Sequence, residues 1–96
     1  MLDLVSAYEN YLTKIKRAST NTIASYLRDI RQFAGWLRHN EDADVIDATQ
    51  LNISSYLSFL ESEGRSGATV SRCLASLKNF YSYVVSSGFL EQTPVT

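Results

Sequence analysis

The chain has 96 residues, of which 45% are hydrophobic and 11% aromatic, and this suffices for one small globular domain with a single core. One cysteine excludes an internal disulfide, and no apolar run approaches the roughly 20 residues that span a bilayer. Met1 is followed directly by a helical pattern rather than by a cleavable signal segment. We therefore expect a soluble, cytoplasmic protein with no membrane partner.

The net charge of −1 argues against a nucleic-acid partner, but the charges are unevenly spread along the chain. Residues 11–40 carry six basic residues against one acid, Asp29. Residues 41–63 carry six acids and no base, whereas residues 64–90 carry three bases and no acid. A folded domain with two basic segments can present one positive face, which is typical of a surface that binds an anionic partner.

The first predicted helix covers residues 3–16. Asp3 at its start and two lysines near its end suit the helix dipole. Apolar residues recur at helical spacing, and the expected buried stripe is Leu4, Tyr8, Tyr11 and Ile15. Arg17 and Ala18 then form a short link to the next helix.

The second predicted helix begins after Ser19, a good N-cap residue, and continues to about residue 40. Its apolar stripe consists of Ile23, Leu27, Ile30, Ala34 and Leu37, with Tyr26 and Phe33 beside it. The opposite side carries Asn21, Arg28, Arg31 and Arg38, with Ser25 and Gln32 beside them. A solvated face usually mixes both charge signs, so this face indicates contact with something anionic.

The acidic residues 41–48 are predicted to form a loop. Thr49 should cap a third helix over about residues 50–63, and Gly64 should end it. The side chains of this helix that are expected to point inward are Ile53, Tyr56, Leu57 and Leu60.

A fourth helix is predicted over residues 68–86, and Gly88 should end it. Its apolar stripe is Val70, Cys73, Leu74, Leu77, Tyr81 and Val84, with Phe80 alongside. Its outer face carries Ser71, Arg72, Ala75, Lys78, Asn79 and Ser82. Small residues between two bases allow a helix to approach a nucleic-acid backbone or groove closely. Four helices with short links predict an all-α compact bundle.

Three segments resemble the N-terminal core-binding domain of the tyrosine recombinases, the phage-integrase and Xer family. The first segment is Asn21-Thr22-Ile23, Tyr26, Arg28-Asp29-Ile30, Phe33 and Trp36-Leu37. The second is Thr69, Arg72, Leu74, Leu77-Lys78, Phe80-Tyr81 and Tyr83. The third is the exit from Gly88 to Pro94, where Thr93 stands in place of the family's usual Asn.

The resemblance implies an all-α, four-helix, SAM-like orthogonal bundle. Residues 1–92 would be the core-binding, DNA-binding domain, and residues 93–96 would begin the linker to a C-terminal catalytic domain that this chain lacks. In the family, the two domains clamp duplex DNA for site-specific recombination or DNA integration, and neighbouring recombinase protomers take part. Strand cleavage belongs to the catalytic domain, so we expect this chain to be no enzyme by itself and to have no catalytic residue, metal or cofactor.

The resemblance places the second and fourth helices against DNA, and the charge pattern independently selects the same two helices. Lysines and arginines would contact phosphates, while Asn21, Thr22, Ser25 and Asn79 would position the helices or touch base edges. The full set of expected DNA-binding residues is Lys16, Arg17, Asn21, Thr22, Ser25, Arg28, Arg65, Thr69, Arg72, Lys78 and Asn79.

Simpler interpretations of several residues remain open. The six tyrosines are expected to pack in or near the core rather than act as nucleophiles, and Cys73 is expected to be a small buried hydrophobe. Trp36 should pack against the first or third helix, the alternative being a contact with another domain. The rival function is a helical protein–protein interaction module, in which the acidic residues 41–47 would matter as much as the bases. Salt dependence of duplex binding distinguishes the two functions.

Overall fold

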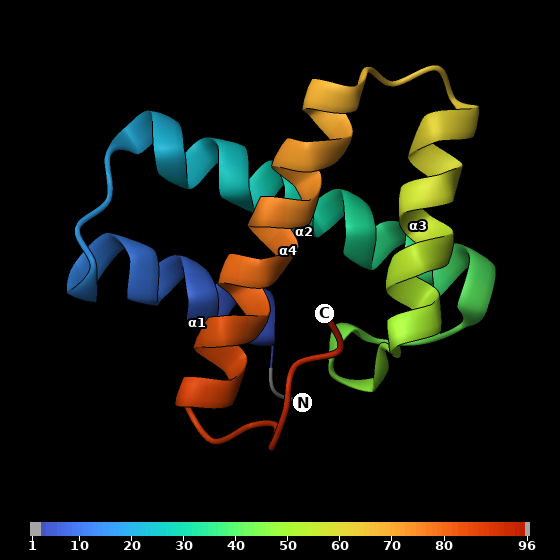
Figure 1. Cartoon of the computed structure of the whole chain (residues 1–96). Helices are drawn as coiled ribbons and strands as arrows, with labels where there is room; N and C mark the ends of the chain where they lie inside the picture. Colours follow the sequence, from blue (N-terminus) through green and yellow to red (C-terminus); the bar gives the residue numbers. More distant parts are fainter. Residues whose placement is uncertain (1–2, 96) are drawn as a thin grey trace.

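The computed structural model describes residues 3–95, and every regular element within that range is helical (Figure 1). The elements are α1 (Leu4–Asn10), the π-helical η1 (Tyr11–Ile15), α2 (Thr20–Glu41), the 3₁₀-helical η2 (Val45–Asp47), α3 (Gln50–Ser62) and α4 (Gly67–Ser86). In Figure 1, α4 crosses in front of α2, and α3 packs on the C-terminal part of α2. The prediction of an all-α, four-helix bundle is therefore confirmed. Within residues 3–95, none of the helices combines the length and hydropathy that crossing a membrane requires.

Local capping chemistry sets where helices begin and end. The side chain of Ser19 accepts a hydrogen bond from the Thr22 amide at the start of α2, as predicted. Thr49 and Asn52 form a reciprocal capping box at the start of α3. Gly64 has φ +80° just after α3, a left-handed conformation that glycine adopts without strain.

The first helix departs from the prediction after Asn10. The Lys16 amide donates to the Tyr11 carbonyl at 3.0 Å, which is a π-helical bond five residues back. Leu12 continues the buried face of Leu4 and Tyr8 at a spacing of four residues. Because a π turn holds more residues than an α turn, Ile15 at the end of this turn is rotated away from that face and is 74% exposed. The placement of Ile15 in the buried stripe was wrong because it assumed 3.6 residues per turn throughout.

A single core joins the helices. The fully buried large side chains include Tyr8, Ile30, Phe33, Leu37, Leu77, Phe80 and Tyr81, and Tyr11, Leu57 and Leu74 are partly buried around them. Cys73 is buried, as predicted. Trp36 packs on α3, with ring centroids 5.3 Å from Tyr56 and 6.2 Å from Phe59, which confirms its predicted packing role.

The acidic segment between α2 and α3 is more ordered than the predicted loop. It contains η2, whose Val45 is buried in the core. The Asp44 side chain accepts from the Val45 amide at 2.7 Å and so caps this turn. Near the other end of the chain, the residues after α4 fold back on the domain, because Val95 is only 6% exposed.

Candidate nucleic-acid interface

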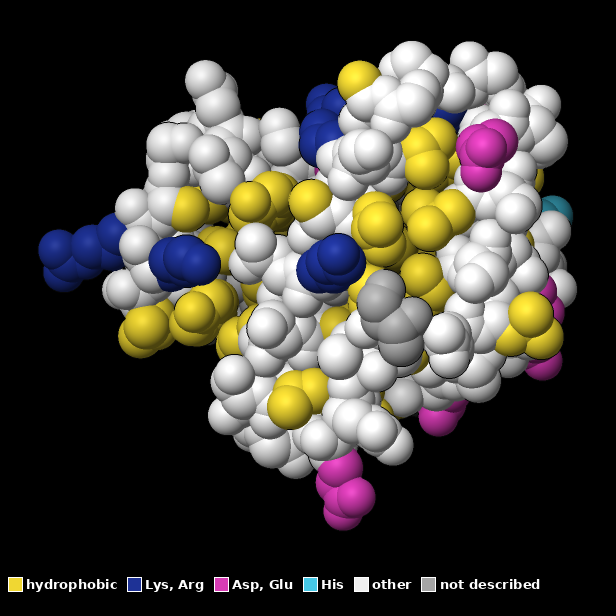
Figure 2. Space-filling model, in the orientation of Figure 1, with side chains coloured by type: hydrophobic (Ala, Val, Ile, Leu, Met, Phe, Trp, Pro, Cys, Tyr) yellow, Lys and Arg dark blue, Asp and Glu magenta, His cyan; other side chains and the backbone are white. Residues whose placement is uncertain are grey.

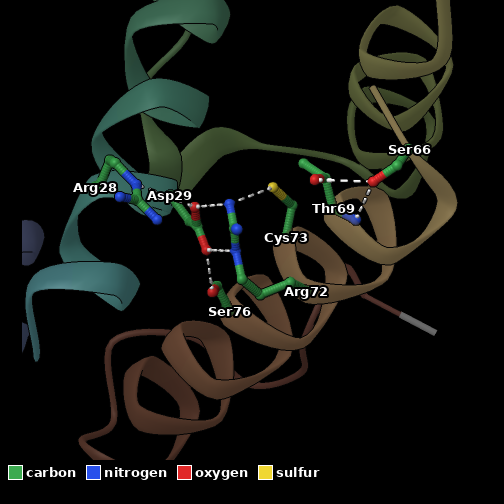
Figure 3. Close-up of polar contacts among 7 residues, drawn as sticks. All are labelled: Arg28, Asp29, Ser66, Thr69, Arg72, Cys73 and Ser76. Atoms are coloured by element: carbon green, nitrogen blue, oxygen red, sulfur yellow. Dashed lines mark hydrogen bonds and ion pairs between the residues drawn. The ribbon is translucent and has the colours of Figure 1, made fainter. Parts of the chain in front are cut away.

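A buried carboxylate joins α2 and α4 where the two helices meet (Figure 3). Nε and Nη2 of Arg72 donate to the two carboxylate oxygens of Asp29 at 3.2 and 3.0 Å. Ser76 Oγ donates to Asp29 Oδ2 at 2.7 Å. The Asp29 side chain is 1% exposed, whereas that of Arg72 is 45% exposed. A buried carboxylate is tolerated when it is paired and hydrogen-bonded in this way.

Arg28 flanks the same carboxylate. Its Nε lies 4.0 Å from Asp29 Oδ1, and its side chain is 56% exposed. Two guanidinium groups therefore share one carboxylate, which leaves a net charge of +1 on a partly exposed cluster. The hydrogen bond to Asp29 is the main cause that raises the pKa of Arg72 above its ordinary value, so this guanidinium stays charged.

The importance of Asp29 was missed by the sequence reasoning, which counted it only as the lone acid in a basic helix. A signal was available, because Asp29 lies three residues after Tyr26 and four before Phe33 and therefore faces the apolar side. Ser76 lies four residues after Arg72 on α4 and was not singled out either. Neither signal names the partner, since Arg72 and Asp29 are 43 residues apart.

The structure brings some of the predicted DNA-binding residues together. Lys16 and Asn79 line one hollow between the end of η1 and the C-terminal half of α4. Lys78 is exposed on the adjoining part of α4, and Arg17 is exposed in the link with φ +51°. Figure 2 shows lysine and arginine side chains distributed over this face, with most of the acidic side chains near its edges.

Four predicted polar residues lie in the first two turns of α2 or α4. Thr22 Oγ1 accepts from Ser19 Oγ at 2.8 Å in the first turn of α2, and Thr69 Oγ1 accepts from Ser66 Oγ at 3.1 Å in the first turn of α4. Each threonine hydroxyl keeps its own proton for a further partner. Asn21 is exposed beside Thr22, and Ser25 is half-buried one turn further along.

Arg65 is separated from the Lys16 and Asn79 hollow. It lines a second hollow, between α2 and α3, together with Trp36 and Phe59. Two other arginines, left outside the expected set, form exposed ion pairs: Arg31 with Glu9 at 3.2 Å and Arg38 with Asp44 at 3.8 Å. Within residues 3–95, by contrast, Lys16, Arg17, Arg65 and Lys78 take part in no ion pair.

Comparison with known proteins supplies the family. The model described as phage integrase, N-terminal SAM-like domain, matches residues 5–88. A protein of Caldanaerobacter subterraneus named as a tyrosine recombinase is 37% identical over 95% of this chain and 31% of its own length. Tyrosine recombinase XerD of Listeria innocua is 30% identical over 99% of this chain and 32% of its own length. Tyrosine recombinase XerC of Pediococcus pentosaceus is 27% identical over 97% of this chain and 31% of its own length.

No solved structure gives a significant match. The chain spans about a third of the length of these curated relatives. The family model covers far more than half of the chain, from within α1 to just beyond α4. The chain therefore belongs to the phage-integrase N-terminal SAM-like domains of the tyrosine recombinases.

Proposed function

We propose that this chain is the DNA-binding domain of a site-specific tyrosine recombinase or integrase, and that duplex DNA lies against α2 and α4. Cleavage and joining of strands would be carried out by a catalytic domain of the parent protein. That catalytic domain and neighbouring recombinase protomers would be its protein partners in the cytoplasm. The relatives named as tyrosine recombinases support this assignment.

The observation that carries the proposal is the division of the basic residues into paired and unpaired ones. Arg31 and Arg38 are neutralised by Glu9 and Asp44, respectively. Lys16 and Lys78, on the η1 and α4 side, take part in no ion pair within residues 3–95. Cations that form no ion pair can each neutralise one DNA phosphate and release its counterion.

The test is duplex binding as a function of salt. The affinity of a short labelled duplex for the chain would be measured by fluorescence anisotropy over a series of salt concentrations. We expect a dissociation constant in the non-specific range of about 10⁻⁴–10⁻⁶ M at physiological salt, because few phosphates are contacted. Lys78→Ala should make the fall of log affinity with log salt less steep, by about one unit of slope.

The matched control is Arg38→Ala, which removes one positive charge that is already paired with Asp44. It should leave the slope unchanged. A wild-type chain without salt-dependent duplex binding would refute the proposal, and so would equal slope changes in the two variants.

A further inference from the structure

The contact between Arg72 and Asp29 uses only part of the guanidinium group. Asp29 accepts from Nε and Nη2, and Nη2 also lies 4.0 Å from Cys73 Sγ. The two N–H groups of Nη1 have no hydrogen-bond acceptor within residues 3–95. The guanidinium is therefore bound to Asp29 along one edge, and because the side chain is 45% exposed, another edge is open to solvent.

The anchor is itself fixed by its neighbours. Ser76 is fully buried and donates to Asp29 Oδ2 at 2.7 Å, so Arg72 and Ser76 of α4 both donate hydrogen bonds to the same carboxylate of α2 (Figure 3). The Arg72 side chain consequently loses its rotamer freedom when the domain folds rather than when a ligand binds. An immobilised long side chain otherwise costs about 0.5–1.5 kcal/mol at binding, which corresponds to roughly a twofold to twelvefold change in affinity.

We infer that Asp29 and Ser76 are positioning residues that hold the open edge of Arg72, beside Arg28, as a preformed site for one phosphate of the DNA backbone. The inference rests on the proposed function and adds to it a specific phosphate site and the residues that build it. The planar guanidinium fork matches the geometry of phosphate oxygens, and a second guanidinium lies on the same carboxylate.

Positioning and simple neutralisation predict opposite effects for the carboxylate. If Asp29 only cancelled the charge of Arg72, its removal would leave a more positive face and tighter DNA binding. If Asp29 positions Arg72, removal of the Asp29 carboxylate should instead weaken DNA binding, once the effect of the added positive charge on affinity has been subtracted. Charge appears in the slope of log affinity against log salt, whereas positioning appears in the affinity extrapolated to one-molar salt, where the logarithmic salt term is zero.

Three variants of the full chain separate the two effects. Ser76→Ala removes the hydrogen bond to the carboxylate without changing any charge. Arg72→Lys keeps the charge and loses the two-point contact. Both should keep the wild-type salt slope and weaken duplex binding roughly twofold to twelvefold at every salt concentration. Asp29→Asn should keep or steepen the slope and weaken the extrapolated one-molar affinity by a similar factor.

Each variant would be measured at a temperature where circular dichroism shows it to be folded, so that lost stability is not mistaken for lost affinity. If Asp29→Asn does not fold, Ser76→Ala and Arg72→Lys decide the question. If the folded variants had the same affinity as the wild-type chain after extrapolation to one-molar salt, the inference would be overturned and the proposed function would stand. Absence of salt-dependent binding by the wild-type chain would instead overturn the proposed function, and the inference with it.

Discussion

The Tyr81 hydroxyl on α4 donates a 2.6 Å hydrogen bond to the backbone carbonyl of Val45, which lies 36 residues earlier in the chain. Both residues are buried, so this bond fastens the acidic segment between α2 and α3 to the core. Burial raises the pKa of Tyr81 above its ordinary value, and the hydroxyl therefore keeps the proton that it donates.

Tyr81→Phe should destabilise the fold. The substitution keeps the ring in the core but removes this hydrogen bond, and the buried Val45 carbonyl retains only the longer one from the Ala48 amide at 3.4 Å. Loss of one such bond costs about 0.5–1.5 kcal/mol. Denaturant titration gives the free energy of unfolding. Tyr8→Phe is the matched control, because Tyr8 is equally buried and its hydroxyl has no hydrogen-bond partner within residues 3–95. Equal destabilisation by both substitutions would contradict a role for the Tyr81 bond.

Leu77→Ala tests the core itself. Leu77 is 1% exposed, and removal of a large buried side chain costs roughly 2–5 kcal/mol through lost burial and the cavity that remains. Leu51→Ala, at a leucine of α3 that is 73% exposed, should change the free energy of unfolding by less than about 0.5 kcal/mol. A change that small at Leu77 as well would place it outside the core.

The buried tyrosines predict a loss of stability in alkali. Burial raises the pKa of Tyr56 from an ordinary 10.0 to about 12, and it also raises the pKa values of Tyr8 and Tyr81. The folded chain therefore holds these protons at a pH where the unfolded chain releases them. The stability from Tyr56 is complete below pH 10 and is lost as the pH rises toward about 12.

Circular dichroism and tyrosinate absorbance, followed together during an alkaline titration, would measure this loss. Tyrosine ionisation should accompany unfolding for the buried rings. Tyr56→Phe should reduce the loss of stability over this pH range, because the substituted ring cannot ionise. Complete tyrosine ionisation while the helical signal persists would contradict the prediction.

Features of the fold that depend on local chemistry could be predicted from the sequence. Ser19 and Thr49 are N-caps because their side chains accept from amides three residues away, and that spacing is visible in the chain. The π turn at Tyr11–Ile15 could not be predicted in this way, since its register shift depends on which side chain, Leu12 or Ile15, packs into the core.

In the candidate site, too, local features could be predicted from the sequence and contacts between helices could not. The basic character of α2 and α4 is readable from the sequence, and so is the apolar-side position of Asp29. That Arg72 turns two of its nitrogens inward to Asp29 depends on how the two helices cross, and no local pattern encodes that crossing. Composition can therefore predict a positive face without predicting which cations on it are free.

The last prediction concerns where DNA lies on the domain. Amide chemical-shift changes on addition of a duplex should cluster at residues 16–28 and 69–79, because those segments carry Lys16, Arg28, Arg72 and Lys78. Asp47→Lys, in the exposed acidic segment, should leave this pattern of shifts unchanged, since no DNA contact is proposed there. Asp44 is unsuitable for this control because it caps Val45 and pairs with Arg38. Changes concentrated instead at residues 41–47 and on α3 would refute the DNA face and favour a protein-binding module.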